Sequence, residues 1–222
     1  MNNIKVKDYK LLDNEQSLIH NIDSFINLDI KNNNELYFYK NELSKLELNL
    51  LDNSTLNIYL FNIKTTNLEI IINQHLNSKI NLYYSFINNN DTYLKIISNI
   101  KNDKNINNVF LKNISNKGLS KIDVVANIEK STKDNVMLEK VNVINLEGTA
   151  LVNPDILCSS FEVEANHENT IGSINNEQLD YLMSKSLSYN AAKELICKGF
   201  ILDNMNDYMK ELINKEGGVN FE

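Results

Sequence analysis

Residues 44–97 decide the fold, and they read SKLELNLLDNSTLNIYLFNIKTTNLEIIINQHLNSKINLYYSFINNNDTYLKII. Within this stretch an apolar residue recurs every twelve positions, and a second apolar residue follows two positions after each one. Such alternation of apolar and polar residues is typical of a β-strand that buries one of its faces. Two series carry the rhythm: Leu46, Ile58, Ile70, Leu82 and Leu94, and then Leu48, Leu60, Ile72, Tyr84 and Ile96.

Polar clusters such as Asp52-Asn53-Ser54 separate the strands and have the composition of turns. Short strands at regular spacing fit a β-sandwich, a barrel or a β-solenoid. The repeat stays in register over five strands and lacks the Asn-Gly and Asp-Gly pairs that tight hairpins prefer, and both features favour the solenoid. The register slips in a polar stretch at residues 101–108, after which the alternation continues to Val152.

The apolar spacing changes from two residues to three or four after Gly172. This spacing predicts three short helices, over residues 176–185, 189–199 and 203–215, with Asn175 or Asn176 and then Ser188 as N-caps and Gly199 as the terminator of the second helix. Three such helices cannot bury a core alone. Their apolar faces therefore dock either on the strands or on another protein.

The chain thus divides into three predicted parts. Residues 1–35 form an N-terminal cap or irregular segment, residues 36–172 a β-solenoid core, and residues 173–222 a helical region. The cap is expected because a solenoid needs its end covered. A small helix or irregular turn there is indicated by Ile19, Ile22, Phe25, Ile26 and Leu28.

Composition excludes several classes of function. The net charge of −7, with acidic residues interleaved among the lysines, argues against nucleic acid as a partner. The N-terminus carries no apolar signal segment, and no run approaches the length of a membrane span, so we expect a cytoplasmic protein with no membrane partner. Two cysteines are too few for a disulfide framework. The abundant asparagines are interpreted as default polar residues and not as a binding ladder.

Residues 153–201 contain the most specific pattern in the chain, and they read NPDILCSSFEVEANHENTIGSINNEQLDYLMSKSLSYNAAKELICKGFI. This stretch resembles the C-terminal signature of the SufB/SufD family of iron–sulfur cluster assembly scaffold proteins. That signature has a Pro-containing strand, a His followed by a Thr, a G-x-[IL]-x-x-[ED]-[EQ]-[QL]-x-Y-L segment and an A-x-x-[LM]-[IL]-x-x-G-F helix. The matching residues are Pro154, His167, Thr170, Gly172, Ile174, Glu177, Gln178, Leu179, Tyr181, Leu182, Ser186, Ala191, Ala192, Leu195, Ile196, Gly199 and Phe200.

The resemblance implies a right-handed parallel β-helix followed by a small helical domain. It also implies that this domain binds a SufC-like ABC-type ATPase, and that the β-helix pairs with a SufB-like subunit or with a second copy. Deleting residues 176–222 would then abolish ATPase binding and leave the β-core folded. The candidate ATPase-binding residues are Leu179, Tyr181, Leu182, Leu195, Ile196 and Phe200.

The chain departs from the family pattern in length and in one motif. It resembles a short member, without room for the N-terminal helical region and longer β-helix that members usually carry. SufB-type chains carry a Cys in an N-x-C-G-A-H-T segment, whereas the corresponding residues 137–146 hold neither Cys nor His, which makes the chain SufD-like. Yet His167-Glu168 matches the His-Glu pair of SufB-type chains, so the choice between the two subfamilies stays open.

His167 is the candidate metal ligand, with Glu168 beside it as a second candidate at the subunit interface, where the resemblance implies that an iron–sulfur cluster forms transiently. An imidazole can bind iron, and its second nitrogen needs an acceptor. Successive strand residues point to opposite faces, so Glu164 or a partner residue is as plausible an acceptor as Glu168. A plain surface histidine is the alternative. Cys158 and Cys197 are interpreted as structural, and His20 and His75 are assigned no role.

No enzyme motif is present, since the chain has no glycine-rich phosphate loop, no G-x-S-x-G and no H-E-x-x-H. We therefore expect a scaffold subunit that is not an enzyme and binds no nucleotide itself. Two alternatives stay open: a carbohydrate-binding β-solenoid, and a structural module that keeps the family fold without cluster chemistry.

Overall fold

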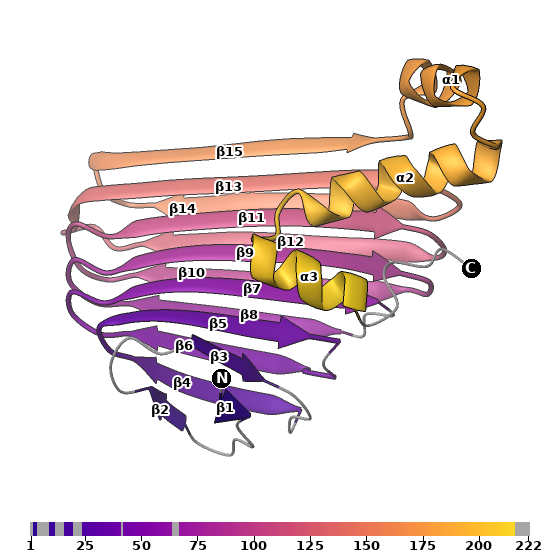
Figure 1. The fold of residues 1–222 in the computed structure, drawn as a ribbon. Helices are drawn as coiled ribbons and strands as arrows, with labels where there is room; N and C mark the ends of the chain where they lie inside the picture. The colour runs from indigo at the N-terminus through magenta and orange to yellow at the C-terminus, as the bar shows by residue number, and fades with distance from the viewer. Residues whose placement is uncertain are drawn as a thin grey trace.

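The computed structural model describes residues 24–40, 42–63 and 67–215, together with the backbone of three short N-terminal strands. Two parallel sheets dominate it (Figure 1). Sheet A has eight strands: β1 (Asn2–Asn3), β3 (Gln16–Ile19), β5 (Asn33–Tyr39), β7 (Thr55–Ile63), β9 (Lys79–Asn88), β11 (Ile106–Ser115), β13 (Lys133–Asn145) and β15 (Glu162–Gly172). Sheet B has seven strands: β2 (Tyr9–Leu11), β4 (Phe25–Ile30), β6 (Lys45–Leu50), β8 (Leu68–Gln74), β10 (Thr92–Ile100), β12 (Leu119–Ile128) and β14 (Thr149–Cys158).

The chain alternates between the two sheets, so each coil contributes one strand to each sheet. Leu46 of β6 pairs with Ile70 of β8, whereas Ile58 between them lies in β7 and pairs with Leu82 of β9. The twelve-residue rhythm is therefore half a coil. The strand pairings among the described residues are all parallel, which confirms the predicted β-solenoid over a sandwich or barrel.

The coils lengthen from the N-terminal end to the C-terminal end. Hydrogen-bonded side chains one coil apart are separated by 24 residues for Asn49 and Asn73, by 26 for Asn73 and Asn99, and by 28 for Asn99 and Asn127. The separation reaches 30 for Asp123 and Asn153. Figure 1 shows the corresponding widening toward β13 and β15. This growth explains why the fixed rhythm in the sequence is lost after residue 100.

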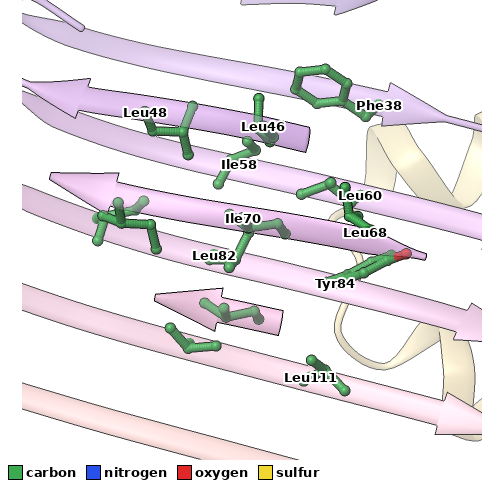
Figure 2. Close-up of a cluster of buried hydrophobic side chains, with 14 of the residues drawn as sticks. Phe38, Leu46, Leu48, Ile58, Leu60, Leu68, Ile70, Leu82, Tyr84 and Leu111 are labelled. Carbon is green, nitrogen blue, oxygen red and sulfur yellow. The ribbon is translucent and has the colours of Figure 1, made fainter. Parts of the chain in front are cut away.

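The core lies between the sheets and is built from the inward residues of each strand. Leu46, Ile58, Ile70 and Leu82 are fully buried, as is Tyr84 (Figure 2). Inward side chains of successive coils stack along the solenoid because each register pair places two of them side by side, as Tyr84 lies between Leu60 and Leu111. Each fully buried aliphatic side chain contributes about 1.5–3 kcal/mol.

Asparagine side chains form a ladder along the outer face of sheet B. The amide of Asn73 donates to the side-chain oxygen of Asn49, Asn99 donates to Asn73, and Asn127 donates to Asn99, each over 2.9 Å. A shorter ladder on sheet A links Asn108 to Asn81. The interpretation of the asparagines as default polar residues is therefore incomplete, since these residues tie successive coils together.

The turns also depend on residues that accept a left-handed backbone. Asn53 and Asn77 have φ values of 59° and 53°, a region that Asn enters at lower cost than most residues. The Asn77 amide donates to the Asn53 side-chain oxygen over 2.7 Å, so these turns stack like the strands. Gly118 has φ 76°, and a Cβ there would lie 2.6 Å from the carbonyl carbon of Asn90 in the next turn.

Three helices follow the last strand: α1 (Asn176–Ser184), α2 (Tyr189–Leu202) and α3 (Asp207–Lys215). The predicted caps are present, since the Asn175 side chain accepts from the backbone N–H groups of Glu177 and Gln178, and Ser188 caps α2. The predicted stop at Gly199 is wrong. The helix runs on to Leu202, because Gly199 is an exposed helical position and the backbone N–H of Asp203 still bonds to its carbonyl.

Helices α2 and α3 lie across the outer face of sheet A (Figure 1). Cys197, Ile201 and Met209 are fully buried in the apolar cluster that they form with aromatic side chains of the sheet. Polar contacts fix the position: Lys112 of β11 forms an ion pair with Asp203, and the Asn204 amide donates to the Phe110 carbonyl over 3.1 Å. These two helices therefore pack on the chain's own solenoid. No helix in the described part of the chain is long and apolar enough to cross a membrane.

The N-terminal segment differs from the expected cap over residues 1–35. Strand β4 pairs in register with β6, and β5 pairs with β7, so residues 25–30 and 33–35 belong to the sheets. Ile26 and Leu28 are fully buried core residues of β4 and not of a helix. Buried and exposed residues alternate every two positions along β4, as in other strands. Six residues of sequence were too few to distinguish this pattern from that of a helix. Ile22 lies outside the described residues, and of Ile19 only the strand backbone is described.

Removing one rung of the sheet B ladder should lower stability. Asn99→Ala deletes the bond that Asn99 donates to Asn73 and the bond that it accepts from Asn127. We expect the free energy of unfolding to fall by about 1–2 kcal/mol, measured by urea titration. Lys95→Ala, at an outward position of the same strand, is the matched control and should cost less than about 0.5 kcal/mol. Equal losses for the two variants would contradict a structural role of the ladder.

Candidate functional site

The C-terminal end of the solenoid is open. Strands β14 and β15 are the last strands of sheets B and A, and each is paired on one side only within the described chain. The inward residues of this coil are only partly covered, among them Val152, Ile156 and Val163. Outward apolar residues gather nearby, with Leu157 54% exposed and Phe161, in the turn before β15, fully exposed. Unpaired strand edges of this kind are templates for pairing with another chain.

His167 lies on β15, at this open end. Its register partner on β13 is Glu139, so the two side chains project from neighbouring strands on the same face of sheet A. That face is the inner one, because Met137 and Val141 on either side of Glu139 are buried in the core. His167 is nevertheless exposed, since no further coil covers β15.

Glu139 is fully buried, and neither of its carboxylate oxygens has a hydrogen-bond partner. Apolar clusters lie on both sides of it along the strand, one containing Val141 and the other Met137. Burial, with a smaller contribution from the negative charge of Asp155, raises the pKa of the Glu139 carboxyl to about 7. A buried carboxylate without partners is costly unless something neutralises it.

Sequence reasoning missed Glu139, although a signal was present. In the run Met137, Glu139, Val141 and Val143 a single charged residue occupies an inward position of an alternating strand. A charge at a core position is expected only where it is paired or functional.

Glu168 lies on the opposite face of β15 from His167. Its carboxylate forms an ion pair with Lys140 over 2.8 Å, on the outer surface of sheet A. Glu164 occupies the same outer face, because it also lies an odd number of residues from His167. Neither residue therefore faces the His167 side chain from within this chain, whereas Glu139 does.

The cysteines are placed apart from this pair. Cys197 is fully buried under α2, and burial raises the pKa of its thiol to about 11, which disfavours the thiolate needed for metal binding. Cys158 is exposed at the end of β14, where its thiol donates to the Ser160 carbonyl over 3.2 Å. Across the residues that the structure describes, no three His, Cys, Asp or Glu side chains gather as a metal site. At the open end this chain therefore offers at most the pair Glu139 and His167.

A second candidate surface is the groove between α1 and α2, with a volume of about 750 Å³. Five of the six residues predicted to bind an ATPase line it: Tyr181, Leu182, Leu195, Ile196 and Phe200. The sixth, Leu179, is buried beneath α1. Tyr181 and Leu195 are 61% and 51% exposed, so the groove presents apolar surface that the solenoid does not cover.

Comparison with known proteins agrees with these features. Residues 42–200, which include strands β6 to β15, α1 and most of α2, match the family model described as the SufBD core domain of the SUF system for iron–sulfur cluster assembly. The chain is also 40% identical over 60 residues to an iron–sulfur cluster assembly SufBD family protein from Pyrococcus horikoshii. That match covers 27% of this chain and 14% of the relative.

The raised pKa of Glu139 should make stability fall as the pH rises. The unfolded carboxyl releases its proton near pH 4.5, whereas the folded one holds it to about pH 7. Between these values the folded state binds more protons, so the free energy of unfolding decreases with pH, by about 3 kcal/mol for this one group. Glu139→Gln removes this loss. In chelator-treated buffer, its stability relative to the native chain should increase from pH 5 to pH 8, as measured by urea unfolding.

Glu164→Gln is the control for this pH profile, because Glu164 is exposed on the outer face of β15. Its stability difference from the native chain should stay constant with pH. Asp155, whose charge acts on Glu139, and His167, its register partner on β15, are retained in both variants. Parallel profiles for Glu139→Gln and the native chain would show that the buried carboxyl is not the cause.

Proposed function

This chain belongs to the SufBD family of iron–sulfur cluster assembly proteins, and from that premise we propose that it is a scaffold subunit of a Suf-type assembly complex. It holds two protein partners and contributes part of the surface on which a cluster is built. The observation that carries this proposal is that the chain presents two uncovered surfaces, the open end of the solenoid and the α1–α2 groove.

The open end supports pairing with a SufB-like subunit or with a second copy. The edges of β14 and β15 offer backbone donors and acceptors, and the exposed side chains of Leu157 and Phe161 add apolar area at the same end. A partner that covered this coil would bury both the strand edges and the half-covered core residues beneath them.

The groove supports docking of a SufC-like ABC ATPase. Helices α2 and α3 already cover sheet A, so α1 and the outward side of α2 are not needed to close the chain's own core. Tyr181 and Leu195 present aromatic and aliphatic anchors around a hollow, which is the arrangement found at the centre of protein interfaces. ATP hydrolysis would then belong to the partner, and this chain would act as a non-enzymatic subunit in the cytoplasm.

The open end also supports a role in handling iron. His167 is exposed there with an imidazole that can bind iron, and Glu168 lies beside it in sequence on the outer face. Because the described chain gathers no complete ligand set, the cluster would be transient and shared between subunits. The absence of a complete ligand set in the described chain is also consistent with one alternative, a structural subunit that holds the ATPase without binding iron.

Substitutions in the groove should abolish ATPase binding and leave the fold intact. Tyr181→Ala and Leu195→Ser remove exposed anchors, so the free energy of unfolding should change little. If these residues are anchors, each substitution should weaken binding of a SufC-like ABC ATPase from the same organism by about tenfold or more. Binding is measured by titration calorimetry with the purified ATPase.

Tyr189→Ala is the matched control, because Tyr189 is 54% exposed on α2 and does not line the groove. Its ATPase affinity should equal that of the native chain. Deleting residues 176–222 is a weaker test than the sequence suggested, since it would also uncover the aromatic face of sheet A. Equal binding by the native chain and both groove variants would refute this docking site.

Iron retention should depend on His167. When the native chain is co-expressed with its genomic neighbours and purified without oxygen, the complex should carry iron and sulfide. His167→Ala should lose most of the iron and keep the ATPase, whereas His75→Ala, at an exposed turn, should keep both. An iron-free native complex that retains the ATPase would favour the structural subunit instead.

A further inference from the structure

We propose that Glu139 is a second iron ligand of this chain, so that Glu139 and His167 together form half of a ferrous-iron site at the open end of the solenoid. The inference rests on the proposed function, which assigns iron to this end of the molecule, and it adds a residue that the sequence signature does not include.

The geometry brings the two side chains to one place. Glu139 and His167 are direct register partners on adjacent strands, which lie about 4.8 Å apart in a sheet. Both project from the inner face of sheet A, one beneath the edge strand and one on it. Side chains that project from register partners on one face can reach a common ion, and imidazole and carboxylate are both ligands that ferrous iron accepts.

The residues around Glu139 provide no group that pairs with its negative charge. Its carboxylate oxygens have no hydrogen-bond partner, and the inward neighbours on β13 are Met137 and Val141. Its register partner on the other side, in β11, is Val109. None of these residues carries a positive charge. The charged group that acts on Glu139 is Asp155, whose sign is the same, so this carboxylate is neutralised either by a proton or by a bound cation.

The site is open on the side where a partner would sit. Two protein ligands leave at least two positions of the iron free, since iron in protein sites takes four or more ligands. His167 is exposed toward the end of the solenoid, so those positions face the uncovered coil. A second subunit pairing with β15 would bring its own side chains to the same ion. The chain therefore supplies a half-site for Fe²⁺ that the partner completes.

The histidine signals of the purified chain test this inference without any assembly activity. The chain has three histidines, so the ring signals in a heteronuclear NMR spectrum can be assigned by His20→Ala, His75→Ala and His167→Ala. Fe²⁺ alone, added without oxygen, is paramagnetic and should broaden the His167 ring signal at concentrations that leave His75 unaffected. In Glu139→Gln the Fe²⁺ concentration needed for half-broadening should rise by about tenfold or more.

Glu164→Gln is the matched control, with the same chemical change on the outer face of β15, and it should titrate like the native chain. Far-ultraviolet circular dichroism of Glu139→Gln checks that the fold is kept. Unchanged Fe²⁺ titration of Glu139→Gln overturns the inference, as does a native His167 signal that does not respond to Fe²⁺. Neither result decides the proposed scaffold function, which is tested separately by the ATPase-binding and iron co-purification experiments.

Discussion

The parallel, in-register stacking of coils is the constraint on which the rest of this structure depends. Once backbone hydrogen bonds fix Leu46 above Ile70 and Ile58 above Leu82, each inward position must hold a side chain that packs on the one below it. The outward positions follow the same rule, which is why asparagine amides form rungs along sheet B. Coils lengthen gradually toward the C-terminal end, and no further strand of the described chain lies beyond β14 and β15.

The helices cover one side of this stack and form the second exposed surface of the molecule, the α1–α2 groove. Helices α2 and α3 use most of their apolar side chains to cover the aromatic face of sheet A, and the Lys112–Asp203 ion pair holds them in place. Helix α1 lies beyond them, at the same end of the molecule as β15 (Figure 1). The groove for a proposed ATPase and the open coil for a proposed subunit therefore share one end.

Sequence alone predicted the features that repeat and missed those that depend on which strands become neighbours in the fold. The two-residue alternation identified the strands, and the change of spacing after Gly172 identified the helices, because both are local patterns. The twelve-residue step could not show that successive strands belong to different sheets. Nor could it show that Ile26 and Leu28 lie in a strand, because a six-residue segment supports either period. The groove residues were predicted through the family signature, and the structure brings five of the six together.

Glu139 and Glu168, on adjacent strands of sheet A, show how strand alternation alone places two carboxylates in different surroundings. Glu168 faces outward, where solvent and Lys140 stabilise its charge, and such an exposed pair contributes little to stability. Glu139 faces inward, where the same charge is unfavourable and an apolar residue would make the coil more stable. The inward positions of the solenoid are almost all Leu, Ile or Val. The register partner of Glu139 on the preceding coil is Val109, so a carboxylate at position 139 departs from this apolar packing. This departure occurs beside β15, the edge strand at the C-terminal end of the described solenoid, next to the exposed imidazole of His167. The position lowers the stability of the isolated chain, and in the proposed half-site a bound cation would offset that loss.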